Sequence, residues 1–233
     1  MRRTRTAVNL EPAAPRPSSA DRPLTVAYRL EDLVARRSLD RPLQHLLDAA
    51  VRAALNIVIS GDAGSGKTTM LNALYASIPA DERPERIVLG DTRGTEALRL
   101  LNVMAHGDGG ALATVRTASV DGALPALAAL AGAATPTAST RLAATTAGHA
   151  VDLIVHLERA DDGARRVREV ALPVLQGRHY GLSTLAGFEP GRRPGHGRFR
   201  HYPVSAHLAR RLRAGGESIP SVFRADHFGT PTR

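Results

Sequence analysis

Cysteine and tryptophan are both missing from the 233 residues of this chain, and aromatic residues make up only 3% of it. The absence of cysteine excludes disulfide bonds, thiolate metal sites and a cysteine nucleophile. With so few aromatic rings, we expect a core built from Leu, Val, Ile and Ala. Hydrophobic residues account for 43% of the chain, which is enough to pack one domain of this length.

A long apolar segment is missing as well. The basic stretch over residues 1–23 has no apolar core of signal-peptide length. The longest apolar stretch, residues 123–134, is too short to span a bilayer. We therefore expect a cytoplasmic protein, at most peripheral at the inner face of the cell membrane. Composition predicts a disordered tail over residues 1–23, one domain over 24–224 and a short tail over 225–233.

Lysine is nearly absent, since 30 of the 31 basic residues are Arg and only Lys67 is Lys. The formal net charge of +9 favours acidic partners, such as a nucleotide, a nucleic acid or an anionic membrane. Residues 191–213, with seven Arg and no acid, are the one segment where a basic patch is plausible. Solvated surface is the commoner explanation, and only Phe199 and Tyr202 are available there for base stacking, so nucleic-acid binding is the least favoured alternative.

Apolar periodicity and the positions of Gly and Pro indicate alternating helices and strands. Helices are predicted over residues 30–37, 42–54, 67–78, 96–104, 121–134, 139–146 and 202–213. Strands are predicted over residues 55–60, 86–90, 111–116, 151–157 and 165–172. This alternation is typical of an α/β fold with a mainly parallel sheet that helices cover on both faces.

Residues 61–68, GDAGSGKT, match the phosphate-binding pattern G-x-x-x-x-G-K-[ST] in full. A predicted strand precedes this P-loop and a predicted helix follows it, which is the context that the motif requires. Backbone amides of the loop and of the helix N-terminus bind phosphate oxygens in such motifs, while Lys67 reaches the β- and γ-phosphates and Thr68 offers its hydroxyl to Mg²⁺. The predicted nucleotide-binding residues are Gly61, Asp62, Ala63, Gly64, Ser65, Gly66, Lys67, Thr68 and Thr69.

Asp91 closes the apolar strand that follows the P-loop helix. In P-loop enzymes a carboxylate at such a strand end holds Mg²⁺ or polarises the attacking water. An Asp directly after a strand is equally common as a turn residue or a helix cap. Asp108 lies in a Gly-rich turn, HGDGG, and is better explained by the turn than by a phosphate contact.

Four stretches of the chain resemble the ATPases of type II and type IV secretion systems, most closely the tight-adherence pilus branch, the CpaF-like motors. The stretches cover residues 30–61, 61–83, 83–104 and 197–223. The resemblance implies a RecA-like domain that binds ATP and Mg²⁺, a hexameric ring and inner-membrane secretion or pilus proteins as partners. It also implies catalytic roles for two residues. Asp91 matches the family's catalytic acid, normally Glu, and Arg93 matches an arginine that follows it.

The chain departs from this family in several respects. Residues 78–86 form a short loop, where the family carries an acidic box and arginines that complete neighbouring sites. The family's two histidines fall on Asp108 and Arg116, and its large N-terminal domain has no match. The resemblance thus implies nucleotide binding, but two alternatives stay open for the chemistry. One is an ATPase that drives pilus assembly or export, and the other is a non-hydrolysing relative that regulates a full-length motor.

Overall fold

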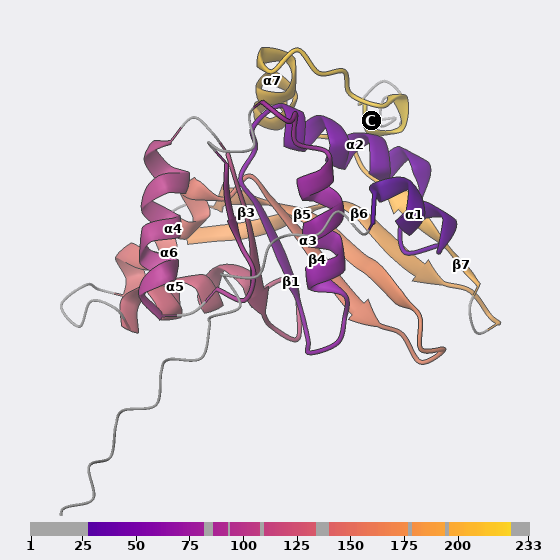
Figure 1. Ribbon diagram of the computed structural model, residues 1–233, viewed down its shortest axis with the longest axis horizontal. Helices are drawn as coiled ribbons and strands as arrows, with labels where there is room; N and C mark the ends of the chain where they lie inside the picture. The colour runs from indigo at the N-terminus through magenta and orange to yellow at the C-terminus, as the bar shows by residue number, and fades with distance from the viewer. Residues whose placement is uncertain are drawn as a thin grey trace, which may run out of the picture.

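A computed structural model describes residues 28–81, 86–92, 94–107, 110–133, 140–176, 179–193 and 196–224 (Figure 1). Both predicted tails, over 1–23 and 225–233, lie outside the described residues, as do Arg93 and Asp108. The helices are α1 (Leu30–Ala35), α2 (Arg41–Arg52), α3 (Lys67–Ala76), α4 (Gly94–His106), α5 (Ala123–Ala133), α6 (Thr140–Ala150) and α7 (Ala206–Ala214). The strands are β1 (Ile57–Gly61), β2 (Ile87–Leu89), β3 (Ala111–Arg116), β4 (Leu153–Arg159), β5 (Arg165–Gln176), β6 (His179–Pro190) and β7 (Gly197–His201).

Each predicted helix and strand is confirmed by an element at the same place in the chain. β6 and β7 were not predicted. Their sequences carry Gly, Pro and Arg rather than a clear apolar alternation. These strands form because β6 pairs antiparallel with β5, and β7 with β6, so each is stabilised by the neighbour that precedes it.

The strands form one sheet in the order β2-β3-β1-β4-β5-β6-β7. β2, β3, β1 and β4 pair in parallel, whereas β5, β6 and β7 extend the sheet with antiparallel pairs. The predicted α/β fold is confirmed, and the parallel half of its sheet has β1, the strand before the P-loop, in an interior position. The antiparallel half of the sheet is larger than expected, because it includes β6 and β7, which the sequence did not indicate.

Two hydrophobic cores lie on opposite faces of the sheet. Ile57 and Ile59 of β1 belong to one core, together with residues of α1, α2, α3 and α7. Val58 belongs to the other core, with residues of α4, α5 and α6. Figure 1 shows the second group of helices together on one side of the strands. Because successive side chains of a strand point to opposite faces, a strand covered on both sides is apolar along its whole length.

The helices differ in how their N-termini are capped. The Asp40 side chain accepts a hydrogen bond from the Leu43 N–H at 3.1 Å at the start of α2. The Ser205 hydroxyl accepts one from the Leu208 N–H at 3.2 Å at the start of α7. The N-cap of α3 is Gly66, which has no side chain to offer. Since the first N–H groups of a helix have no intrahelical partner, those of α3 are placed to bind a ligand.

Candidate functional site

The predicted phosphate-binding loop leaves β1 at the carboxyl end of the parallel strands and enters α3. Gly61 and Gly64 both have positive φ, at 147° and 76°. A Cβ atom on Gly61 would lie 2.3 Å from the carbonyl oxygen of Leu157 in β4, so this close approach requires glycine. Within the loop, the Ser65 N–H donates to the carbonyl oxygen of Asp62 at 3.2 Å. The strand–loop–helix context that the motif requires is therefore present.

The side chain of Lys67 folds back over the loop. Its Nζ donates hydrogen bonds to the carbonyl oxygens of Gly61, at 2.8 Å, and Asp62, at 2.7 Å. Burial lowers the pKa of Lys67, and the positive charge of Arg116 lowers it further, while Asp91 and Asp62 oppose this shift. An anion bound over the loop would offset the repulsion between the two cations.

Arg116 ends β3 directly beside the P-loop. In the parallel register of β1 and β3 its partner is Gly61, and its side chain is exposed. The next residue, Thr117, donates its N–H to the carbonyl oxygen of Gly61 at 3.4 Å. Arg116 stands at the position where the resembled secretion ATPases have a histidine. The fold thus brings a permanent positive charge to the phosphate loop at this position.

Asp91 follows β2 by two residues, at the same edge of the sheet as the P-loop. Because β3 lies between β2 and β1, two strand spacings, about 10 Å, separate the ends of β2 and β1. The Asp91 N–H donates to Thr114 Oγ1 at 2.6 Å. Its φ of 61° is left-handed, a conformation that Asp adopts more readily than most residues. Its exposed carboxylate is therefore held at the open edge of the site.

A magnesium ion would find few protein ligands here. Thr68 is exposed in the first turn of α3, and Asp91 is exposed at the end of β2. No group of three or more His, Cys, Asp and Glu side chains that could hold a metal occurs in the described part of the chain. Mg²⁺ commonly takes one or two protein oxygens and completes its shell with water and phosphate. A hydroxyl and a carboxylate at this edge fit that pattern.

A second arginine, which the sequence analysis missed, reaches the loop from the first position of β5, directly after the β4–β5 turn. Arg165 Nε donates to the carbonyl oxygen of Gly64 at 2.9 Å. Its side-chain carbons lie over Gly66, because a Cβ atom there would be 3.3 Å from Arg165 Cδ. An ion pair between Asp162 and Arg166, at 2.7 Å, holds the turn. No local pattern marks Arg165, because only the pairing of β4 with β5 brings the turn back onto the loop.

Beneath the loop, β1 and β4 share a buried polar contact. Ser60 Oγ lies 2.9 Å from His156 Nδ1, and both residues are buried. Burial lowers the pKa of His156, although the charges of Glu158 and Glu169 oppose this shift. The pair therefore favours a neutral imidazole, which joins the strand before the P-loop to its parallel neighbour.

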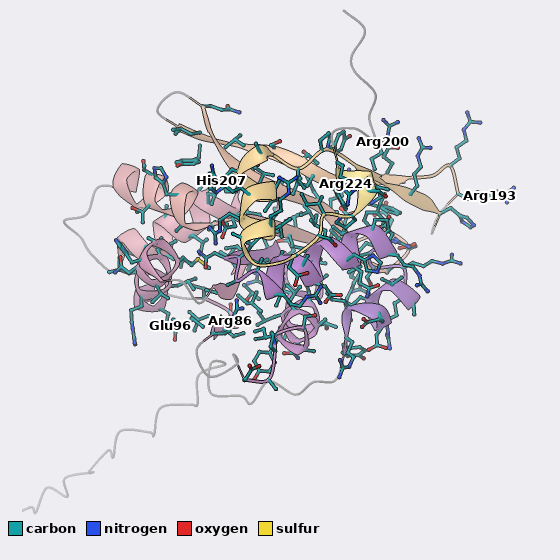
Figure 2. The ribbon with its side chains drawn as sticks, turned by 90° about the horizontal axis from the view of Figure 1, so that it is seen from above. Arg86, Glu96, Arg193, Arg200, His207 and Arg224 are labelled. Carbon is teal, nitrogen blue, oxygen red and sulfur yellow. The ribbon has the colours of Figure 1, made fainter. Side chains whose placement is uncertain are left out.

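The basic segment over residues 191–213 does not form a single surface. It spans the β6–β7 turn, β7 and α7, and Figure 2 shows Arg193 at the hairpin end and His207 far from it on α7. Glu189 forms an ion pair with Arg200 at 2.5 Å. The charge of β7 is thus partly neutralised by β6, which weakens the nucleic-acid alternative.

Comparisons with known proteins give the site a context. No protein-family model matches the chain. The chain is 31% identical over 203 residues to the conjugal transfer protein TrbB of Rhizobium radiobacter, a match that covers 69% of this chain and 61% of that protein. It is 30% identical over 128 residues to the type IV secretion system protein PtlH of Bordetella pertussis, covering 35% and 38%. Over part of its length the chain is therefore similar to conjugal transfer and type IV secretion proteins.

The similarity covers only part of each relative. The chain spans 61% of the length of the R. radiobacter homologue and 55% of a probable TrbB of Sinorhizobium fredii. A crystal structure of the VirB11 ATPase of Brucella suis, in complex with sulphate, matches with a TM-score of 0.48 and 24% identity, over 66% of this chain and 64% of that chain. This structural likeness is too weak to add to the description of the site.

The branch of the resembled family and the roles of the site residues both remain predictions. None of the homologues named above is named for tight-adherence pili, so the placement in that branch is not confirmed. The roles predicted for the site residues also stay predictions, including that of Arg93, which lies outside the described residues.

Within the described residues, no helix combines the length and the apolar character that a membrane crossing needs.

Proposed function

We propose that this chain binds ATP with Mg²⁺ at residues 61–69, as a nucleotide-dependent component of a conjugal transfer or type IV secretion system. The observation that carries the proposal is the complete P-loop in its structural context. The loop follows an interior parallel strand, and α3 begins at a glycine without a side-chain cap. Homology to TrbB and PtlH supports the secretion context.

The phosphate tail lies over the loop in this proposal. Lys67 exchanges its two carbonyl contacts for the β- and γ-phosphate oxygens, and the first N–H groups of α3 donate to the phosphates. Arg116 from β3 and Arg165 from β5 add positive charge beside the same loop. Three cations from three different elements therefore surround the position of the triphosphate, which is strongly anionic.

Thr68 and Asp91 would hold Mg²⁺ in this proposal, and Asp91 would also orient the attacking water. Mg²⁺, when bound, neutralises charge on the β- and γ-phosphates. The Asp91 carboxylate is one methylene shorter than the Glu of the resembled family, so it reaches less far toward a water. We infer that the chain hydrolyses ATP slowly, to drive export or pilus assembly. The alternative is a module that binds ATP without hydrolysing it and regulates a full-length motor.

The partners are part of the proposal. The resemblance implies a ring of several copies at the cytoplasmic face of the inner membrane, in contact with secretion or pilus proteins. The short loop over residues 78–86 leaves no room for the arginines with which the resembled family completes neighbouring sites, so a ring of identical copies would lack them too. Slow hydrolysis is therefore expected both of the isolated chain and of a ring made of this chain alone.

Calorimetric titration of ATP, with and without Mg²⁺, tests the proposal. Lys67→Ala should weaken ATP binding at least tenfold, about 1.4 kcal/mol, and leave the fold intact, because the Lys67 side chain donates its hydrogen bonds to carbonyl oxygens of the loop and not to the core. Arg210→Ala, which removes an exposed cation on α7, serves as the matched control and should bind ATP like the wild type. Equal ATP affinity in the Lys67→Ala protein would rule out the P-loop assignment.

A further inference from the structure

Four helices end around one cavity at the edge of the sheet opposite the P-loop. The cavity has a volume of about 490 Å³. Asn56 lines it and directly precedes β1, whereas the P-loop follows β1, so the two sites lie at opposite ends of the same strand. The rest of the lining lies at or just beyond the C-terminal ends of α2, α4, α6 and α7, and includes Ala53, His106, Ala150 and Gly215.

The helix ends make this cavity rich in hydrogen-bond acceptors. The last four carbonyl groups of an α-helix have no intrahelical partner, and the aligned peptide dipoles leave a partial negative charge there, about half an elementary charge. The four helices are 12, 13, 11 and 9 residues long, so the dipoles of each add over at least two turns. Because four such ends meet at one place, the cavity favours a ligand with positive charge.

Asn56 supplies an acceptor that has no partner. Its Nδ2 donates to the carbonyl oxygens of Met104, at 2.9 Å, and Ala150, at 2.8 Å, which fixes the orientation of the amide. Asn56 is only 5% exposed, and its Oδ1 has no hydrogen-bond partner among the described residues. Buried polar atoms are rarely left unpaired. A ligand that donates hydrogen bonds would supply the partner, and a ligand that only accepts them would not.

The charged side chains around the cavity are compatible with a bound cation. Of the described residues that line it, only Arg211 carries a permanent charge. Arg211 donates to Asp152 Oδ1 at 2.9 Å, so the carboxylate offsets its charge. His106 Nδ1 lies 2.9 Å from the carbonyl oxygen of Asn102, which can only accept. The proton of the neutral ring is therefore on Nδ1, and Nε2 is a further acceptor.

We propose that this cavity binds a guanidinium group. A guanidinium carries five N–H donors in one plane, which serve Asn56 Oδ1 together with carbonyl groups of the helix ends. It is also more weakly hydrated than an ammonium, so its transfer into a half-enclosed site costs less. The source is a small guanidino compound or an arginine side chain of another protein molecule, including a second copy of this chain, which has 30 Arg. The site is separate from the P-loop and does not depend on nucleotide binding.

The test is a titration of the nitrogen-15-labelled full chain with N-acetyl-arginine amide, followed by backbone amide chemical shifts. N-acetyl-citrulline amide has the same shape without the charge and is the ligand control, and sodium chloride at equal ionic strength is the salt control. The arginine compound should shift the amide signals of Gly107 and Gly215, which line the cavity, and leave that of Gly64 in the P-loop unchanged. It should bind at least about fivefold more tightly than the citrulline compound, because charge-assisted hydrogen bonds are the stronger ones.

Ala105 is the position for the variants, since it lines the cavity and is exposed in the last turn of α4. Ala105→Lys places a competing cation at the site and should weaken binding of the arginine compound about tenfold, whereas Ala105→Glu should strengthen it about threefold. Ala129→Lys, at an exposed position of α5 outside the lining, is the matched control and should bind like the wild type. Asn56→Ala should abolish binding, but Asn56 also joins the ends of α4 and α6, so the Ala105 variants decide the outcome if that protein does not fold.

Light scattering identifies the source of the guanidinium group. If the chain associates with itself and both Ala105→Lys and the arginine compound dissociate it, the ligand is an arginine of a second copy. If the chain stays monomeric while the arginine compound binds, the ligand is a small guanidino compound or an arginine of a different protein. The proposal is overturned if the amides of the lining do not shift, if the citrulline compound or the salt shifts them equally, or if Ala105→Lys binds the arginine compound like the wild type.

Discussion

Arg165 Nε donates a hydrogen bond to the carbonyl oxygen of Gly64 at 2.9 Å, which joins the β4–β5 turn to the P-loop across 101 residues of sequence. The contact places a guanidinium group against the loop. Asp162 of the turn pairs with Arg166, the second residue of β5, so the start of β5 that carries Arg165 is held against the turn. The phosphate site is thus bounded by the turn as well as by the loop itself.

Arg165→Ala should weaken ATP binding about three- to tenfold, since one charge-assisted contact to a partly exposed site is worth about 1 kcal/mol. Arg159→Ala is the matched control, because Arg159 pairs with Arg165 across β4 and β5 and should leave ATP affinity unchanged. Calorimetry measures both variants. If Arg165→Ala binds ATP as tightly as the wild type, the guanidinium does not contact the phosphates and only stabilises the loop.

The isolated chain should hydrolyse ATP at well below about one per second, because an arginine missing from a phosphoryl-transfer site costs roughly 10³–10⁵ in rate. Asp91→Asn should abolish the remaining Mg²⁺-dependent turnover. Asn suits this test because it keeps the size of the side chain and tolerates the φ of 61° at this position. Asp91→Glu should raise the rate only modestly. Steady-state phosphate release measures all three, and turnover of several per second in the wild type would contradict slow hydrolysis.

Two glycines of the P-loop should respond differently to alanine. Gly64→Ala should cost about 1–2 kcal/mol of unfolding free energy, because its φ of 76° is left-handed but nothing lies within 4 Å of an added Cβ. Gly61→Ala should cost more, roughly 3 kcal/mol or above, since its Cβ would lie 2.3 Å from the carbonyl oxygen of Leu157. Urea unfolding at neutral pH gives both values. A similar loss of unfolding free energy in the two variants would show that the β4 backbone moves away from the added Cβ atom at little cost.

Acid should destabilise the fold through His156. Burial lowers the pKa of His156 below its ordinary 6.5 in the folded state, so the unfolded chain takes up the proton first as the pH falls. This contribution to stability is fully present above pH 6.5 and is lost as the pH falls from 6.5 through the lowered folded pKa. His156→Asn should therefore flatten the fall in unfolding free energy between about pH 7 and pH 5.

Urea unfolding across that range provides the measurement, and His45→Asn, at an exposed site on α2, is the control. The control should follow the wild-type pH dependence. A His156→Asn protein whose stability falls with pH as steeply as that of the wild type would show that other groups account for the acid sensitivity.

The local features of the site could be predicted from the sequence because each lies within a short window. The apolar run before Gly61, the glycines of the loop and Lys67 are consecutive or nearly so, and they specify strand, turn and helix start by local conformational preference. The helices and strands that carry a clear apolar period were predicted for the same reason. β6 and β7 lack such a period, and the pairing with β5 and with each other decides them.

The surroundings of the loop were decided only by tertiary structure. The sheet order places Arg116 beside Gly61 and leaves β3 between the P-loop and Asp91. The β4–β5 turn brings Arg165 onto the loop. None of these neighbours is close to the loop in sequence. Their positions follow from how the strands pair and how the helices pack on the sheet, and no local pattern of residues encodes that pairing.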